Sequence, residues 1–350
     1  MTTWLTTREN VQESLDVSSS ARSNKRVDRA IAAASLSVEK MLLRTFRPVV
    51  ATYSFPWPAP DTRTSYWRLW LDALDLISVT TLQAGGETID AADYFLEPTN
   101  TGPPYRRVEI DLSSTSSFTS QSATFQRSIT IAGLWGHSNT ERTAGALDGL
   151  ITDSATTLNV TDASEIGVGD VIVIDSERMN VTGRSWLDTT VNTGGALTDV
   201  VSDRTLAVSD GTLFAEGEVL LVNSEQMIIT DIAGNNLTVR RGWNGSVLAA
   251  HSSGDDIYAS RTLTVERGLN GTTAASHADA ASISAHVVPS AVDSLTVSEA
   301  QILLGAKRAG QAAESGAENN ARSTTGSAIA MERHDVWVAY GRKARFRSVG

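Results

Sequence analysis

The chain has 350 residues, of which 41% are hydrophobic, with a formal net charge of −11 and no cysteine. This composition is typical of a folded protein with a sizeable core, and it excludes disulfides, iron–sulfur clusters and thiolate zinc sites. There is no apolar run of about 18 residues to span a membrane, and the first residues lack the pattern of a signal peptide. We therefore expect folding in a reducing cytoplasm, with no membrane partner.

The negative charge is concentrated in one part of the chain. Residues 150–290 contain 18 acidic and 7 basic side chains, which accounts for the whole excess, because the other residues contain 22 of each. An acidic segment attached to a neutral body is typical of a solvated surface. It argues against this segment binding nucleic acid.

Two helices are predicted first. Residues 7–17 form a short helix that ends at the capping residues 18–20. A longer amphipathic helix at about 21–46 has its apolar positions at Val27, Ile31, Ala34, Val38, Met41 and Leu42. Its basic start comprises Arg22, Lys25, Arg26 and Arg29. These four residues form either a solvated face or a docking surface for an acidic partner.

Strands are expected after Pro48, which ends the long helix. Alternation of apolar and polar residues predicts strands at 49–57, 66–71, 77–84, 94–96, 106–112 and 126–134. Gly85 and Gly86 predict a hairpin turn, and the Ser/Thr-rich residues 113–122 predict a mobile loop.

One sequence unit then occurs twice. Thr157–Thr182 matches Thr205–Thr230 without a gap, and Asn236–Ala259 matches Thr262–Ala285. The order of the copies indicates one module, at about 205–259, nested within another of the same kind. Short apolar runs separated by turn residues predict that each module is a small antiparallel barrel or sandwich. Residues shared by the two copies are interpreted as scaffold.

The C-terminal part returns to a helical pattern at about residue 296, with an apolar stripe that runs to Ala309. Residues 310–327 are rich in Ala, Ser, Gly and Asn and predict a frayed segment or linker. Residues 336–347 alternate apolar with polar side chains and are basic, which predicts an extended docking arm. Its candidate contact residues are Trp337, Tyr340, Arg342, Lys343, Arg345, Phe346 and Arg347. An edge strand of the body is the alternative interpretation.

The best candidates for a catalytic or metal site fall inside the repeat. Asp175 and Glu177 have counterparts in the second copy, so we interpret them as a hairpin turn and not as an acid pair. His251 and His277 also align with each other, which favours a packing or turn-bonding role over metal binding. No phosphate-binding glycine motif or Gly-x-Ser-x-Gly motif occurs. We expect no enzyme activity, no catalytic residue, no cofactor and no metal.

The tryptophans allow two interpretations. Exposed rings would form a surface that docks sugars or proteins, and buried rings would be ordinary core. The rings considered are Trp57, Trp67, Trp70, Trp135, Trp186, Trp243 and Trp337.

Several strings outside the repeat point to one family. They are Leu5–Val11, Arg29–Glu39, Phe46–Pro48, Arg68–Leu71, Asp93–Pro98 and Ile129–Gly136. Together they resemble the head-to-tail connector of tailed bacteriophages, the adaptor beneath the portal, in the version found in actinobacterial phages. Compact adaptors lack the repeated region, which instead resembles add-on β domains of phage structural proteins.

The resemblance implies a virion structural protein, assembled in the host cytoplasm and located at the neck. Such adaptors form a ring, commonly of about twelve copies, between the portal protein and the next tail-completion or head-closure protein. Double-stranded DNA passes through the ring without sequence-specific contacts. The C-terminal arm would reach the portal or the DNA, Arg22, Lys25, Arg26 and Arg29 would lie at the ring interface, and the repeated region could contact the capsid.

The expected architecture is α+β: a helical adaptor body with a small antiparallel β subdomain and an inserted pair of nested all-β modules. The expected domains are a body at 1–149, an insert at 150–289 and a C-terminal helix with a basic arm at 290–350. Within the insert, the outer module takes 157–199 plus 261–288 and the inner module takes 205–259. The rival function is a tail or baseplate protein that binds host-surface glycans through the β modules and exposed tryptophans.

Overall fold

The computed structural model describes residues 4–15, 21–58, 66–118, 126–309 and 319–342. Strands make up 38% of the chain and helices 24%. The expected helical body with a small β subdomain is therefore wrong, because large antiparallel sheets dominate the fold. The apolar stripes near both ends of the sequence suggested a helical core, but the largest buried clusters in the described residues are formed mainly by strands and the loops between them.

The chain forms two compact units, and each unit is built from separate stretches of sequence. The first unit comprises Met1–Ser37 and Glu141–Arg333, and the second comprises Val38–Thr140 and His334–Gly350. Two of the three boundaries fall inside long helices, α2 (Ala21–Leu42) and α4 (Asn319–Tyr340), so each of these helices contributes residues to both units. The third boundary falls between Thr140 and Glu141.

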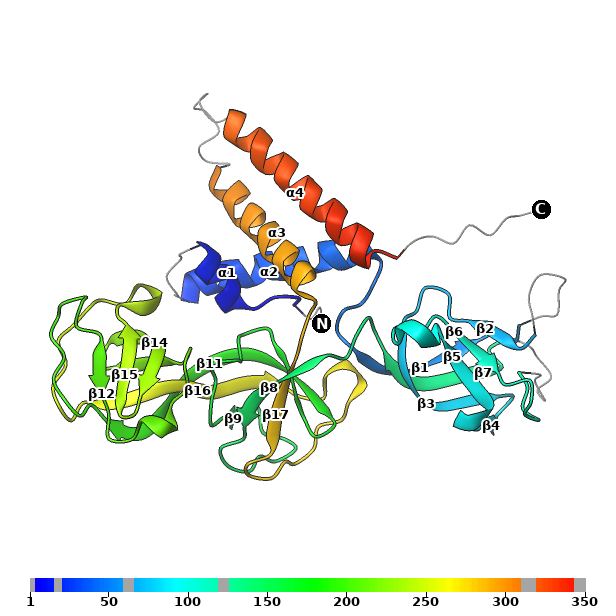
Figure 1. Cartoon of the computed structure of the whole chain (residues 1–350), viewed down its shortest axis with the longest axis horizontal. Helices are drawn as coiled ribbons and strands as arrows, with labels where there is room; N and C mark the ends of the chain where they lie inside the picture. Colours follow the sequence, from blue (N-terminus) through cyan, green and yellow to red (C-terminus); the bar gives the residue numbers. More distant parts are fainter. Residues whose placement is uncertain (1–3, 16–20, 59–65, 119–125, 310–318, 343–350) are drawn as a thin grey trace. The chain divides into compact units, whose positions relative to one another are not determined.

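The first unit contains helices drawn from both ends of the chain (Figure 1). α1 (Arg8–Leu15), the first part of α2 and α3 (Ser290–Ala309) share one apolar cluster. Its buried members are Val11, Val27, Ala30, Ile31, Ala34 and Ala300. The three- and four-residue spacing of these positions in α2 places them on one face, as the sequence predicts.

α4 contradicts two expectations from the sequence. The predicted linker over 310–327 and the predicted extended arm over 336–347 are wrong where they overlap this helix, because residues 319–340 are helical. Val336 is buried while Trp337 and Val338 are 40% and 47% exposed, as expected for neighbouring positions on a helix. The small polar residues of this segment show no clear hydrophobic period, so contacts with the rest of the fold decide its secondary structure.

The second unit holds two antiparallel sheets. The four-stranded sheet has the order β1-β7-β3-β4, and the three-stranded sheet has the order β2-β6-β5. The strands are β1 (Val49–Phe55), β2 (Arg68–Trp70), β3 (Leu76–Ala84), β4 (Glu87–Ile89), β5 (Tyr94–Glu97), β6 (Arg107–Ile110) and β7 (Ile129–Trp135). Residues of both sheets meet in one apolar cluster. The strand predictions for 49–134 are confirmed apart from their ends.

The repeated region forms a ten-stranded antiparallel sheet in the first unit. Its path is β12-β15-β14-β13-β16-β11-β10-β17-β8, and β9 pairs with β16. The strands are β8 (Glu141–Ala146), β9 (Thr157–Asn159), β10 (Val171–Ile174), β11 (Glu177–Asn192), β12 (Thr205–Ala207), β13 (Val219–Val222), β14 (Glu225–Ala233), β15 (Asn236–Arg240), β16 (Asp256–Glu266) and β17 (Ser282–His286).

The two modules repeat the same strand register. Asn180 pairs with Glu266 in one copy and Ile228 with Arg240 in the other, and both ladders then skip one residue, Thr182 or Thr230. We define the outer module as residues 141–185 with 262–286, and the inner module as residues 187–259. Each has its own apolar cluster of buried residues.

The inner module occupies a hairpin position of the outer one. In the inner module, β14 and β15 are joined by the turn at Gly234 and Asn235. At the corresponding point of the outer module, β11 continues into the inner module and the chain returns through β16 (Figure 1). Hairpin tips are exposed and tolerate insertions, because the ladder on either side keeps its pairing.

Candidate functional site

Each β module has a buried glutamate, at corresponding positions, that is held by an arginine and a histidine. In the inner module, Glu225 begins β14 and its side chain is 0% exposed. Arg241 donates to both carboxylate oxygens at 2.7 and 2.8 Å, and His251 Nε2 lies 2.9 Å from Oε2. The backbone N–H groups of Gly242 and Ala249 donate at 3.0 Å. The carboxylate thus has five contacts with four residues, which tie the loops around it together.

The outer module repeats this cluster. Arg267 donates to Glu177 at 2.7 and 2.6 Å, and His277 Nε2 lies 2.9 Å from the same carboxylate. Burial raises the pKa of Glu177 and of Glu225, but hydrogen bonds from the arginine, the histidine and two backbone N–H groups outweigh it and lower each pKa to about 2. Both glutamates are therefore ionised, enclosed and fully bonded, which fits a role in holding the module together.

The predicted turn at Asp175 and Glu177 is only half right. Asp175 has φ 53° and lies in the turn that precedes β11. Glu177 is the first residue of β11 and is 1% exposed. The Arg-Gly-x-Asn-Gly string that follows in both copies is the signal that could have revealed its partner, because the arginine of that string makes the ion pair.

The predicted basic residues of α2 form an exposed row. Lys25, Arg26 and Arg29 are exposed, while the neighbouring Val27 and Ala30 are buried. The side chain of Arg22 lies outside the described residues. Among the described residues these three cations make no ion pair, so the row is a candidate interaction surface of the first unit.

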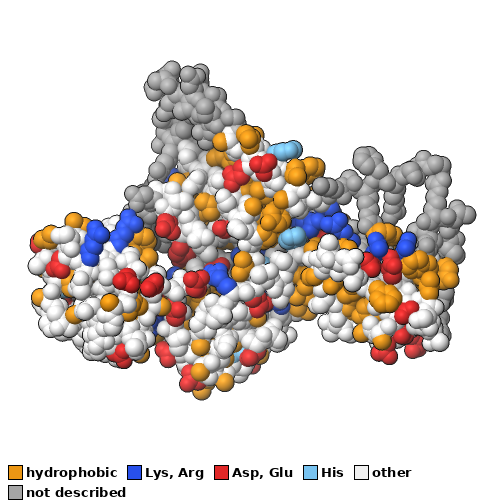
Figure 2. Space-filling view, viewed as in Figure 1, with side chains coloured by type: hydrophobic (Ala, Val, Ile, Leu, Met, Phe, Trp, Pro, Cys, Tyr) orange, Lys and Arg blue, Asp and Glu red, His pale blue; other side chains and the backbone are white. Residues whose placement is uncertain are grey.

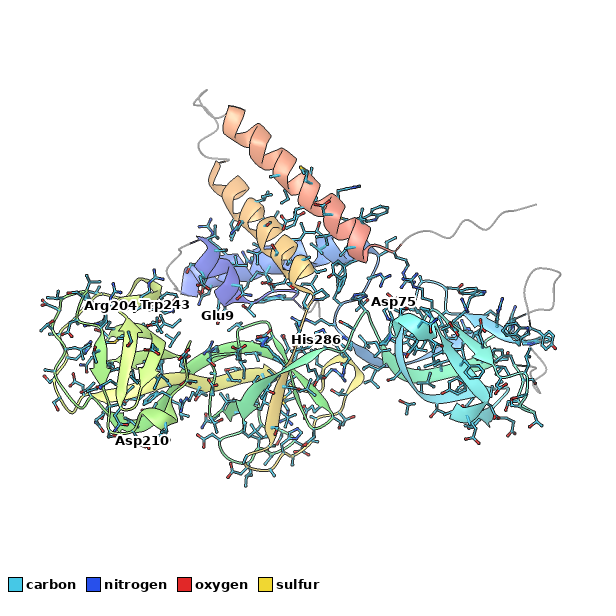
Figure 3. All side chains as sticks on the ribbon, viewed as in Figure 1. Glu9, Asp75, Arg204, Asp210, Trp243 and His286 are labelled. Atoms are coloured by element: carbon cyan, nitrogen blue, oxygen red, sulfur yellow. The ribbon has the colours of Figure 1, made fainter. Side chains whose placement is uncertain are left out.

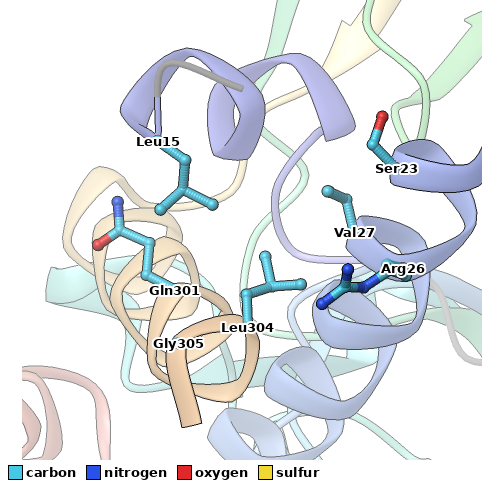
Figure 4. Close-up of a pocket in the computed structure, with 7 residues that line it drawn as sticks. All are labelled: Leu15, Ser23, Arg26, Val27, Gln301, Leu304 and Gly305. Atoms are coloured by element: carbon cyan, nitrogen blue, oxygen red, sulfur yellow. The ribbon is translucent and has the colours of Figure 1, made fainter. Parts of the chain in front are cut away.

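A pocket of about 90 Å³ opens beside this row, between α1, α2 and α3 (Figure 4). It is lined by Leu15, Ser23, Arg26, Val27, Gln301, Leu304 and Gly305. The guanidinium of Arg26 extends from α2 toward Leu304 of α3. The pocket therefore places apolar surface directly next to the row.

Some of the predicted C-terminal residues lie in a cluster of charged and aromatic side chains within the second unit. Arg342 Nη2 lies 2.8 Å from Asp75 Oδ2, and Arg44 Nη1 lies 3.5 Å from the same oxygen. Arg44 also donates to His137 Nδ1 at 2.8 Å, and the ring of Tyr340 packs edge-on against His137. Burial and the charge of Arg44 lower the pKa of His137, so the imidazole is neutral at pH 7.

The cluster ties down part of the predicted docking arm. Tyr340 and Arg342 are engaged within the chain, and Trp337 remains 40% exposed on α4. Lys343, Arg345, Phe346 and Arg347 lie outside the described residues. No signal in the sequence linked Asp75 or Arg44 to the C-terminal residues, which are distant along the chain.

We expect Asp75→Asn to loosen the end of α4. The substitution removes the charge that two arginines share, at a cost of about 2 kcal/mol in local opening. Hydrogen exchange at the Arg342 amide, which donates to Leu42 O at 2.9 Å, should accelerate accordingly. The exposed Asp90→Asn is the matched control. Unchanged protection at Arg342 in the Asp75 variant would contradict this role.

The tryptophans divide between core and surface. Trp135 is buried, Trp337 is the most exposed of those described, and the others are half-buried. Arginine guanidinium groups lie over three of the half-buried rings: Trp67, Trp70 and Trp243. A sugar that stacked on the same ring faces would have to displace these cations.

In residues 4–15, 21–58, 66–118, 126–309 and 319–342, no group of three or more His, Cys, Asp or Glu side chains is arranged to hold a metal ion. None of the helices in this part of the chain is long and apolar enough to cross a membrane. Comparisons of the chain with family models, curated proteins and solved structures found no match.

Proposed function

We propose that this chain is a non-enzymatic structural protein of a tailed-phage virion, which forms a ring at the neck between the portal and the tail. The proposal rests on the contacts of the N-terminal string Leu5–Val11, which resembles the connectors. Arg8 makes two hydrogen bonds to Asp28, at 2.7 and 2.8 Å, and Leu5 N donates to Ser35 Oγ. The string thus has a packing role, which supports a shared helical arrangement in this part of the chain.

The same string also joins the helices to the β modules. Glu9 accepts a hydrogen bond from the backbone N–H of Val168 in the outer module, and Arg8 N donates to Val168 O. Burial raises the pKa of Glu9, although Arg184 and other groups oppose this shift. The adaptor proposed here is thus mostly β, with its helices drawn from both ends of the chain and its modules anchored on them.

The exposed row of α2 is the proposed ring interface. Lys25, Arg26 and Arg29 give one copy a cationic face, and the acidic excess of the chain gives its neighbours the opposite charge. Trp337 and the basic residues beyond Arg342 are the proposed portal-facing or DNA-facing group. The arginines stacked on Trp67, Trp70 and Trp243 favour this function over glycan binding.

We expect the triple variant Lys25→Glu, Arg26→Glu, Arg29→Glu to lose ring assembly, because the reversed row repels the acidic neighbour. Light scattering after size-exclusion chromatography and electron microscopy of the purified chain measure this directly. Lys40→Glu, an exposed cation of the same helix, is the control. Electron microscopy of virions with the chain labelled decides the location, and label away from the neck would overturn the proposal.

A further inference from the structure

The two modules carry different surfaces at corresponding ends. We define the inner tip as residues 197–204 with 240–250, and the outer tip as residues 147–156 with 266–280. The tips correspond because Leu197 bridges to His251 in one and Ile151 to His277 in the other. Both are built around the same Glu–Arg–His cluster, so differences on their surfaces are not required by the scaffold.

The inner tip combines apolar side chains with cations. Val200, Val201 and Val247 are 51%, 59% and 79% exposed. The guanidinium of Arg240 lies 5.0 Å from the centre of the Trp243 ring. The residues meet because Arg241 donates to carbonyls on both loops, at Thr198, Asp203 and Ala249.

Arg204 belongs to the same surface. Its backbone carbonyl accepts from Val239 N, next to Arg240, and its Nε donates to Val201 O at 3.2 Å. Arg204 and Trp243 lie on one edge of the inner module, away from Asp210 (Figure 3), and basic side chains gather on this edge in the space-filling view (Figure 2). Two nearby acids belong to the tip: Asp199 is exposed, and the Asp203 carboxylate accepts from Thr198 N and Oγ1.

The outer tip has the opposite character. Where the inner copy has Arg240, Trp243 and Val247, the outer copy has Glu266, Leu269 and Thr273, and Ser154-Ala155-Thr156 replaces the segment Val200–Arg204. Leu150 is 72% exposed. The exposed acids of this tip are Asp148, Asp153 and Asp279, and Asp175 lies beside it, because its Oδ2 is 2.7 Å from His277 Nδ1. Asp279 is fixed to this loop, because it accepts from Gly149 N at 2.8 Å.

The tips lie at opposite ends of one strand. β11 starts at Glu177, in the outer cluster, and ends at Asn192, where the chain enters the inner tip. A strand of 16 residues spans about 50 Å. The apolar surface that carries Arg204 and Arg240 and the apolar, acidic surface are therefore separated along the length of the paired modules, and they cannot meet within one copy.

We propose that the inner tip of one copy binds the outer tip of a second copy, head to tail. Arg204 and Arg240 face the outer-tip aspartates, and Val247 packs against Leu150. The inference rests on the proposed function because it assumes that many copies of the chain assemble side by side. A contact between two different surfaces propagates, and it closes into a ring when the rotation between copies allows. Each contact can be weak, because the ring makes it many times.

A charge swap tests the contact in the full chain. Arg204→Glu with Arg240→Glu replaces the two cations of the inner tip with acids, and Asp148→Arg with Asp153→Arg replaces two acids of the outer tip with cations. Each double variant alone should self-associate about ten-fold more weakly or worse, because like charges then meet. An equimolar mixture of the two variants, and the chain carrying all four changes, should regain association. Analytical ultracentrifugation measures both, and Asp231→Lys is the control for a charge change elsewhere.

The outcomes of these experiments distinguish what the inner tip binds. Loss of association in the inner-tip variant alone, without rescue in the mixture, would show that this tip binds another part of the neighbouring copy and would overturn the proposal. Association of both variants at the wild-type level would overturn it too, as would a wild-type chain that stays monomeric at its solubility limit. These results are independent of where labelled virions carry the chain, so failure of the neck assignment and failure of the tip contact are distinguishable.

The absence of cysteine allows a second readout. Leu150→Cys with Val247→Cys should give a ladder of disulfide-linked chains on mild oxidation, because each copy then offers one thiol at either end of the contact. Val247→Cys alone should give no species larger than a dimer. The same weak dimer band in both variants would contradict tip-to-tip binding.

Discussion

Replacing Arg241 with alanine is expected to unfold the inner module while leaving the second unit folded. The substitution removes two hydrogen bonds from a carboxylate that is 0% exposed, and it also frees carbonyls of two loops. Breaking a buried ion pair in this way costs about 3–5 kcal/mol, because the remaining charge stays desolvated. Hydrogen exchange resolved by peptide is the measurement, since a chain of two units need not unfold in one step.

Arg240→Ala provides the matched control, because Arg240 is adjacent in sequence but exposed. Its cost should stay within about 0.5 kcal/mol. In the Arg241 variant, protection should fall in β13 and β14 and persist in β1, β3 and β7. Equal protection of β13 and β14 in the two variants would mean that the cluster is not what holds the inner module together.

Acid is expected to destabilise both modules between about pH 4.5 and pH 2. Glu177 and Glu225 have a pKa of about 2 when folded, against an ordinary value of 4.5. A depressed folded pKa means that the unfolded chain takes up protons first as pH falls, so the contribution is complete above pH 4.5 and is lost toward pH 2. Between pH 7 and pH 3, each glutamate should lose about 2 kcal/mol of its contribution.

The double variant Glu177→Gln, Glu225→Gln separates these two residues from the other acids. It should be less stable than wild type at pH 7, and hydrogen exchange in its modules should vary much less between pH 4.5 and pH 3 once the intrinsic exchange rates are corrected. If wild type and variant share the same pH dependence, other carboxylates are responsible for the acid sensitivity.

The sequence repeat made it possible to predict most of the equivalent strands of the two β modules. The gapless match of Thr157–Thr182 with Thr205–Thr230 required equivalent strands, and the structure gives them the same register and the same skipped residue. The alignment missed the leading strands, β8 and the second half of β11, because their sequences differ between the copies. A strand at these positions needs another strand to pair with its backbone, and many different side-chain sequences are compatible with that pairing.

The buried Glu–Arg–His clusters and the C-terminal helix α4 could not be predicted from the sequence. Glu177 follows a turn residue, and its burial depends on Arg267, which is 90 residues away along the chain. The segment that ends in Tyr340 alternates like a strand over a few residues, but Val336 and Tyr340 are one helical turn apart. Short windows cannot separate these periods, and only packing against neighbours does so.

The sequence by itself determined the local structure: the amphipathic face of α2, the strands of residues 49–134 and the existence of two copies of one module. Such features follow from side-chain period and turn residues, which act over a few positions. The tertiary structure alone decided which charges are enclosed and which remain at the surface. Arg241 and Arg240 are neighbours of the same type, yet one is buried on Glu225 and the other is exposed beside Trp243. Burial depends on contacts between distant segments, and desolvation makes the two charges different in energy and in function.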